Sequence, residues 1–161
     1  MKRALGVLVG LLLGCGSAEH HTGSGTIVGT IQGMNLASDH AVAIARMYPP
    51  QTQIKVSPAG VTCETVQAGD RVTFDLGAQK IGIYTVVVGY PSKALLSEAQ
   101  ARAHICPAND SSESQCHDQV RSGKVTITKF DGGEGGKIDG SYELELADGK
   151  ITGTFSAYRC Q

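Results

Sequence analysis

From Thr26 onward, apolar and polar positions alternate in short stretches, each bounded by Gly, Pro, Asp or Asn. Alternation of this kind, with turn residues about every ten positions, is typical of antiparallel strands in a sandwich or a barrel. The pattern predicts a mainly β fold, an antiparallel β-sandwich or barrel-like domain of about eight strands. The expected strands are Thr26 to Gln32, His40 to Met47, Gln53 to Val56, Arg71 to Leu76, Gly82 to Tyr90, Lys124 to Phe130, Gly140 to Leu146 and Lys150 to Tyr158.

The last three expected strands have the clearest pattern. Leu144 and its apolar neighbours alternate with Glu143 and Glu145, which places one face in the core and leaves the two carboxylates as surface charges. Asp148-Gly149 between two alternating runs favours a hairpin with a type I′ turn. The expected inward positions are Val125, Ile127, Leu144, Leu146, Ile151, Gly153, Phe155 and Ala157.

Two segments depart from simple alternation. Ile83 to Val88 is almost continuously apolar, which predicts a central strand covered on both faces. Asp131 to Gly136 is rich in glycine, but it lacks the Lys-Ser/Thr of a phosphate loop and the acidic spacing of an EF-hand. We therefore expect a plain hairpin turn there.

One short helix is expected in an insertion that spans residues 91 to 122. Ser97 opens a Ser-x-x-Gln capping box, and alanines follow at 99, 101 and 103. The helix should end near Ile105, because Pro107 disfavours its continuation. An excursion of this kind is where a binding site would be placed.

Length and charge limit the alternatives. The chain has 161 residues, enough for one small domain with an appendage. Its 14 basic and 15 acidic residues give a formal charge of -1, so the chain lacks the basic footprint that nucleic acid requires. No nucleic-acid partner is expected.

The N-terminus indicates export. Lys2 and Arg3 precede an apolar run from Ala4 to Leu13, which is too short to span a bilayer and is typical of a signal peptide. The sequence Leu12-Leu13-Gly14-Cys15 resembles the bacterial lipobox, which implies cleavage between Gly14 and Cys15 and attachment of lipid to the Cys15 thiol. Attached acyl chains would hold the mature protein at the membrane.

The expected domain organisation follows from this cleavage site. Residues 1–14 are the signal peptide, residues 15–25 are the lipidated Cys15 with a flexible tether, and residues 26–161 form a single β domain. The residue after Cys15 is Gly16 rather than an inner-membrane retention Asp. By resemblance, this favours the outer membrane of a Gram-negative cell envelope.

Four further cysteines remain once Cys15 is lipidated, and an even number in an oxidising compartment predicts two disulfides. Three connectivities are compatible with the sequence. Cys106 and Cys116 bracket a polar segment that has little reason to be ordered unless its ends are tied, so we expect them to pair. Cys63 would then pair with Cys160.

A metal site is the alternative use of the same region. His104, Cys106, Cys116 and His117 have the ligand types of a tetrahedral zinc site. Their spacing does not match the usual gap of two to four residues, and envelope thiols are normally oxidised. We therefore expect no cofactor and keep zinc as the alternative.

Several segments together resemble uncharacterised lipoproteins of myxobacterial-type soil bacteria. They are the lipobox, the opening Gly25 to Gly33, the strand Gly82 to Val88 and an ending of the form Gly-x-Phe-x-Ala-x-x-Cys at residues 153–160. The resemblance implies an envelope location, a β fold and a link between Cys63 and Cys160. It implies no catalytic activity.

The expected function is that of a lipid-anchored envelope protein that acts as a non-enzymatic binding or structural module, with an unidentified protein or glycan partner. The sequence shows no anchor for a hydrolase triad, so an enzyme is the less favoured interpretation. The alternatives are an envelope hydrolase with its site under the 91 to 122 excursion, near His104 and His117, or the zinc-binding protein described above.

Overall fold

A computed structural model describes residues 23–31, 34–58, 63, 71–88, 96–106, 120–133 and 135–160, and every regular element among them is a β-strand. The mainly β, barrel-like prediction is therefore confirmed. The strands are β1 (Ser24–Ile31), β2 (Met34–Tyr48), β3 (Gln51–Ser57), β4 (Arg71–Leu76), β5 (Gly82–Val86), β6 (Gln100–Cys106), β7 (Val120–Phe130), β8 (Lys137–Leu146) and β9 (Lys150–Arg159).

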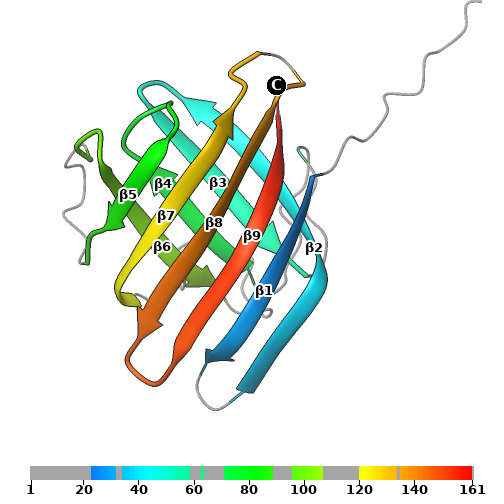
Figure 1. The fold of residues 1–161 in the computed structure, drawn as a ribbon, viewed down its shortest axis with the longest axis vertical. Helices are drawn as coiled ribbons and strands as arrows, with labels where there is room; N and C mark the ends of the chain where they lie inside the picture. Colours follow the sequence, from blue (N-terminus) through cyan, green and yellow to red (C-terminus); the bar gives the residue numbers. More distant parts are fainter. Residues whose placement is uncertain are drawn as a thin grey trace, which may run out of the picture.

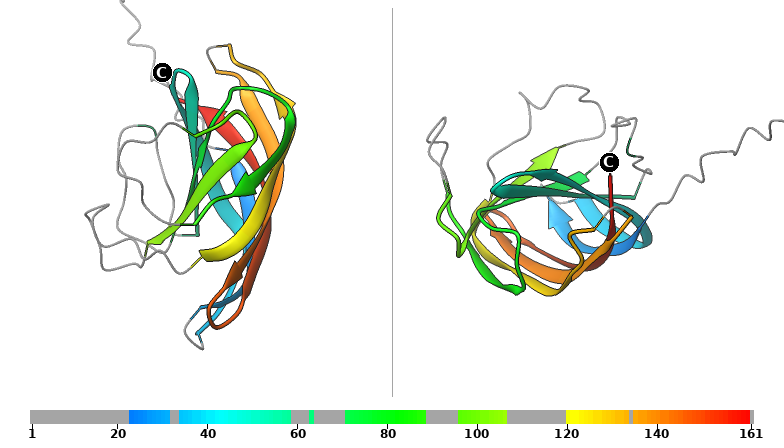
Figure 2. Two further views of the ribbon diagram at one scale, coloured as in Figure 1. Left: turned by 90° about the vertical axis from the view of Figure 1, so that its left-hand side faces the viewer. Right: turned by 90° about the horizontal axis from the view of Figure 1, so that it is seen from above.

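The strands form a closed barrel in the order β1-β2-β3-β4-β6-β5-β7-β8-β9 (Figure 1). Closure comes from β9, which pairs antiparallel with β1 and adds two parallel partners on β2. The other neighbours are antiparallel except β5 and β6, whose parallel pairing breaks the sequential order. Seen along its long axis, the barrel has a flattened cross-section (Figure 2).

Three aromatic rings occupy the interior of the barrel. The ring centroids of Phe74 and Tyr142 are 4.8 Å apart, and each of these rings lies within 6.5 Å of Phe155. The Tyr142 hydroxyl donates a hydrogen bond of 2.9 Å to the carbonyl of Thr26, and burial raises the pKa of this phenol. Gly153 faces Tyr142, and a Cβ there would lie 2.5 Å from the ring. Side chains thus fill the lumen, as small barrels require.

The inward parity expected for the last three strands is confirmed. The large residues at those positions are at most 7% exposed, from Val125 at 0% to Leu146 at 7%. The β8–β9 hairpin also forms, but its turn is placed one residue earlier than expected: the Leu146 amide donates to the Gly149 carbonyl at 2.8 Å, so residues 147 and 148 make the turn. Among the described glycines, those with positive φ are Gly29 and Gly135, so the type I′ expectation at Asp148-Gly149 is wrong.

The expected helix after Ser97 is wrong, because the segment forms a turn followed by β6. The Ser-x-x-Gln motif makes its hydrogen bond, from the Ser97 amide to the Gln100 side chain at 3.0 Å, while the Gln100 amide donates back to the Ser97 carbonyl. Beyond the turn, Ala101 and Ala103 point into the core and Arg102 points outward. Alternate residues of this segment pack into the core, as in a strand, and this packing outweighs the intrinsic helix propensity of alanine.

Two further predictions need correction. Ile83 and Val88 are 65% and 56% exposed, whereas Tyr84 is 1% exposed, so β5 has one covered face and not two. The predicted tether of residues 15–25 extends too far, since β1 begins at Ser24 and the Gly23 amide already donates to the Ala43 carbonyl at 3.0 Å. Strand Arg71–Leu76 has the bounds expected from the sequence.

The predicted Cys63–Cys160 disulfide is present, with a Cα–Cα distance of 5.3 Å across a sequence separation of 97. It packs on Ile44, which is fully buried although it points away from the lumen. Cys116 lies outside the described residues, so the expected Cys106–Cys116 pair stays a prediction.

Phe74→Ala should lower the free energy of unfolding by about 3–5 kcal/mol, because it removes the ring that contacts both Tyr142 and Phe155. Urea denaturation followed by far-UV circular dichroism measures the change. Ile83→Ala is the matched control: this exposed side chain should change stability by less than about 0.5 kcal/mol. Equal losses for the two variants would contradict the filled lumen.

Replacing both Cys63 and Cys160 by Ser should lower the free energy of unfolding by about 4–5 kcal/mol in the chain-entropy view, because the bridge closes a loop of nearly a hundred residues. Urea titration of the parent and the variant measures this. The intact mass of a periplasmically exported chain starting at Gly16 tests the second bridge: two disulfides make it lighter than the reduced formula by four hydrogens. A loss of two hydrogens together with a bound zinc ion would favour the zinc alternative.

Candidate functional site

The outer faces of β3, β4 and β6 carry polar side chains that alternate with the core residues. We call this surface the polar face; it consists of Gln53, Lys55, Arg71, Thr73, Asp75, Arg102 and His104. Strand register places these side chains in rows across the sheet. Gln53, Asp75 and Arg102 are direct partners in one row, and Lys55, Thr73 and His104 in the next. Side chains paired in this way lie about 5 Å apart at Cβ.

Part of the polar face is buried even though it points away from the lumen. Lys55 and Arg71 are each 2% exposed, and Thr73 is 5% exposed. Charged side chains are almost never fully buried in proteins unless they are paired. Burial of two cations on the outer side of a barrel therefore marks this face as a built structure rather than an ordinary solvated surface.

Asp75 is the described carboxylate of the polar face, and it is held by two neighbours. Its Oδ1 accepts a hydrogen bond of 3.1 Å from Gln53, and its Oδ2 lies 3.6 Å from Nε2 of His104. Burial raises the pKa of Asp75, but the hydrogen bonds from His104 and Gln53 and the charges of His104 and Arg102 outweigh it, so the pKa lies below its ordinary value. Asp75 is thus ionised at neutral pH.

Basic side chains are prominent on the polar face. Lys55, Arg71 and Arg102 lie there with the carboxylate of Asp75, and each of the three cations has an interaction partner. Arg46 of β2 extends the first row, because it pairs with Gln53, and its guanidinium donates a 2.8 Å hydrogen bond to the carbonyl of Cys63. The disulfide thus lies at the margin of this basic surface.

The arrangement permits two kinds of chemistry. The part-exposed guanidinium groups of Arg46 and Arg102, set on rigid strands, can bind an anion through charge-assisted hydrogen bonds. The Asp75–His104 contact is the arrangement that orients an imidazole as a general base, and Thr73 lies across the strand pair from His104. Side-chain exposures of 24% for Asp75 and 12% for His104 leave both groups partly accessible.

Of the site residues expected from the sequence, the structure describes some and not others. His104 lies in β6 and Cys106 ends that strand, whereas Cys116, His117, Gly14 and Cys15 lie outside the described residues. Within the described part of the chain, no group of three or more His, Cys, Asp or Glu side chains could hold a metal ion.

The interpretation of Glu143 and Glu145 as surface charges is confirmed. Glu143 lies 3.3 Å from the ammonium of Lys124, and Lys150 lies 3.5 Å from both carboxylates. The hydrogen bond and charge of Lys124 lower the pKa of Glu143. Exposed pairs of this kind contribute little to stability.

Sequence reasoning missed Asp75, Lys55 and their neighbours as site residues. Their signal was present in β4, where Arg71, Thr73 and Asp75 alternate with apolar residues. Alternation shows that they share a face, but the cross-strand partners that complete the cluster depend on register, which a single sequence does not specify.

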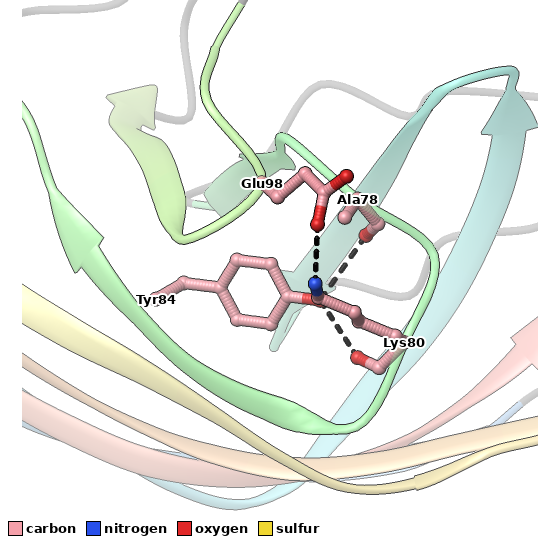
Figure 3. A network of polar contacts seen from close by, with 4 residues as sticks. All are labelled: Ala78, Lys80, Tyr84 and Glu98. Atoms are coloured by element: carbon pink, nitrogen blue, oxygen red, sulfur yellow. Dashed lines mark hydrogen bonds and ion pairs between the residues drawn. The ribbon is translucent and has the colours of Figure 1, made fainter.

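A second polar network, at one end of the barrel, has a structural role. The Tyr84 hydroxyl donates to the carbonyl of Lys80 at 2.7 Å and lies 3.2 Å from that of Ala78 (Figure 3). The Lys80 ammonium forms an exposed ion pair of 2.5 Å with Glu98, which lowers the pKa of Glu98 and raises that of Lys80. These contacts fix the loop between β4 and β5.

No known protein family, curated protein or solved structure matches this chain. Among the described residues, no helix has the length and apolar character needed to cross a membrane.

Asp75→Asn should destabilise the protein at pH 6 but not at strongly acidic pH. The folded-state pKa of Asp75 lies below its unfolded value of about 3.9, so its carboxylate stabilises the fold above that pH, and this contribution is lost as the pH falls through the folded pKa. Urea unfolding of parent and variant at pH 6 and pH 2.5 measures the difference. If the variant's loss in free energy of unfolding were the same at pH 2.5 as at pH 6, the ionised Asp75 carboxylate would not be the stabilising group.

Proposed function

We propose that the protein is a lipid-anchored component of the bacterial cell envelope, and that its barrel is a non-enzymatic binding module for an acidic envelope glycan. The proposal for the anchor is supported by the signal-peptide pattern and the lipobox-like sequence that ends at Cys15. The proposal for binding is supported by the polar face.

The observation that carries the binding proposal is the contrast between the two sides of the barrel wall. Inside, the aromatic rings of Phe74, Tyr142 and Phe155 pack together in the lumen. Outside, β2 and β6 hold the part-exposed cations Arg46 and Arg102 on rigid strands, whereas Lys55 and Arg71 are buried. A partner would therefore bind the outer face at its part-exposed cations.

The part-exposed arginines of this face indicate the class of partner. Arg46 and Arg102 are part-exposed cations, and they flank the row that contains Gln53 and Asp75. Their guanidinium groups suit carboxylates and phosphates, which they bind in a bidentate manner. Acidic glycans of the envelope carry such groups at regular spacing.

Arg102→Gln should weaken binding to an acidic envelope glycan by about 3- to 10-fold, which corresponds to the loss of about one charge-assisted contact. The measurement is co-sedimentation with isolated peptidoglycan, whose peptide carboxylates supply the acidic groups. Lys124→Gln makes the same charge change on the outer face of β7 and should leave binding unchanged. Equal weakening by both variants would show non-specific attraction, and no binding by the parent would refute the proposal.

Cys15→Ala should abolish lipid attachment and release the protein from the membrane fraction, because the acyl chains supply the hydrophobic anchor. Intact mass of the mature protein and separation of membrane from soluble fractions measure this. A mature Cys15 protein with no added acyl mass would refute the anchor while leaving the binding proposal to its own test.

The Asp75–His104 contact favours one second candidate, an envelope hydrolase with His104 as general base. A panel of chromogenic esters and glycosides distinguishes the two. Turnover by the parent that is lost in His104→Gln would replace the binding proposal, whereas binding without turnover in both proteins would support it.

A further inference from the structure

We propose that one end of the barrel rests on the lipid bilayer to which Cys15 is attached. This end, which we call the β2–β3 end, is formed by residues 48–51 between β2 and β3 and residues 77–81 between β4 and β5. The inference rests on the lipid anchor of the proposed function, and it adds which surface of the domain faces the membrane.

Apolar and aromatic side chains are exposed at the β2–β3 end. Tyr48 is 52% exposed and Ile81 62%, and the adjacent Pro49 and Pro50 are also exposed. The two segments are joined by a hydrogen bond of 3.0 Å from the Gln79 side chain to the carbonyl of Gln51. They therefore form one continuous surface rather than two isolated hydrophobic positions.

The two segments have a fixed shape, and the charged residue among 48–51 and 77–81, Lys80, is paired. The Tyr84 hydroxyl donates to the carbonyl of Lys80 and lies within hydrogen-bonding distance of that of Ala78, so the loop that carries Ile81 is tied to the barrel wall (Figure 3). The nearby carboxylate of Glu98 is paired with Lys80 at 2.5 Å. Paired charges beside exposed apolar side chains are compatible with the boundary between lipid headgroups and acyl chains, because neither charge has to be buried alone.

The length of chain between Cys15 and the barrel also favours this end. Eight peptide units separate Cys15 from Gly23, and they span at most about 26–29 Å. Gly23 is hydrogen-bonded to Ala43 of β2. Tyr48 is five residues further along β2, about 17 Å away, whereas the opposite end at Met34 is nine residues away, about 30 Å along the strand. The opposite end is at the limit of the linker even when it is fully extended.

Residue chemistry matches this placement. Tyrosine rings are enriched at membrane–water interfaces, and interfacial contacts bury apolar groups about 5–10 Å deep. A contact of this depth can include Tyr48 but not residues far down the barrel. Val28, opposite Ala37 on β2, is 55% exposed and lies 11 strand residues from the level of Tyr48, up to about 36 Å along β2.

The chain contains no tryptophan, so a single substitution provides a clean fluorescent reporter. Tyr48→Trp and the matched control Val28→Trp are prepared as the mature acylated protein and inserted into vesicles of phosphatidylethanolamine and phosphatidylglycerol. Vesicle flotation measures anchoring. Emission wavelength, and quenching by the same lipids brominated on their acyl chains, measure contact of the reporter with the bilayer. Ile81→Trp serves as a second reporter at the same end.

We expect all three variants to float with vesicles. Emission should shift to shorter wavelength and be quenched by brominated lipid for Tyr48→Trp and Ile81→Trp, and stay unchanged for Val28→Trp. Floating protein whose Tyr48→Trp and Ile81→Trp reporters are not quenched would overturn the inference while leaving the anchor intact. Equal quenching at Val28→Trp would overturn it as well, because the barrel would lie on its side. A mature protein that retains Cys15 but carries no acyl group and does not float would refute the anchor itself and the inference with it.

Discussion

Hydrogen bonding between β1 and β9 closes the barrel, and this closure constrains every other strand. A closed sheet has one inner face, so each strand must send alternate side chains into a lumen of limited volume. Ala43, Ala101 and Ala157 supply small groups to that lumen, which leaves space for Phe74, Tyr142 and Phe155. Gly153 reflects the same limit, because even a methyl group would meet the Tyr142 ring. Packing inside the barrel therefore determines which positions of each strand face outward and can carry polar or charged side chains.

The polar face is a product of this constraint. With the inner positions of β3, β4 and β6 committed to the core, the outer positions are available for charge, and antiparallel register brings Gln53, Asp75 and Arg102 into one row. Asp75 and Gln53 are fixed by strands that are themselves fixed by the core. The cluster is consequently more rigid than a site on loops, which suits recognition of a partner at defined positions.

The sequence predicted the strands correctly where apolar and polar residues alternate without interruption. Arg71–Leu76 and the β8–β9 hairpin follow from alternation, and so does the exposure of Glu143 and Glu145. The sequence failed at β6, where alanine propensity and a capping motif resembled a helix start, although the polar residues Arg102 and His104 already alternated with the alanines. It failed also at β5, where an apolar run has an exposed face. His104 was identified as a candidate site residue, but its partner Asp75 lies 29 positions earlier, and only register brings the two together.

The position of the closing strands has a consequence for how the chain acquires its structure. β1 begins at Ser24 and β9 ends at Arg159, so the two edges that seal the barrel come from opposite ends of the polypeptide. During synthesis, which starts at the N-terminus, β1 has no β9 to pair with until almost all of the described residues have emerged. β2 can pair with it earlier, but the lumen cannot exclude water before the last strand arrives. The barrel can therefore close only late, and the growing chain exposes its apolar side chains until β9 is available.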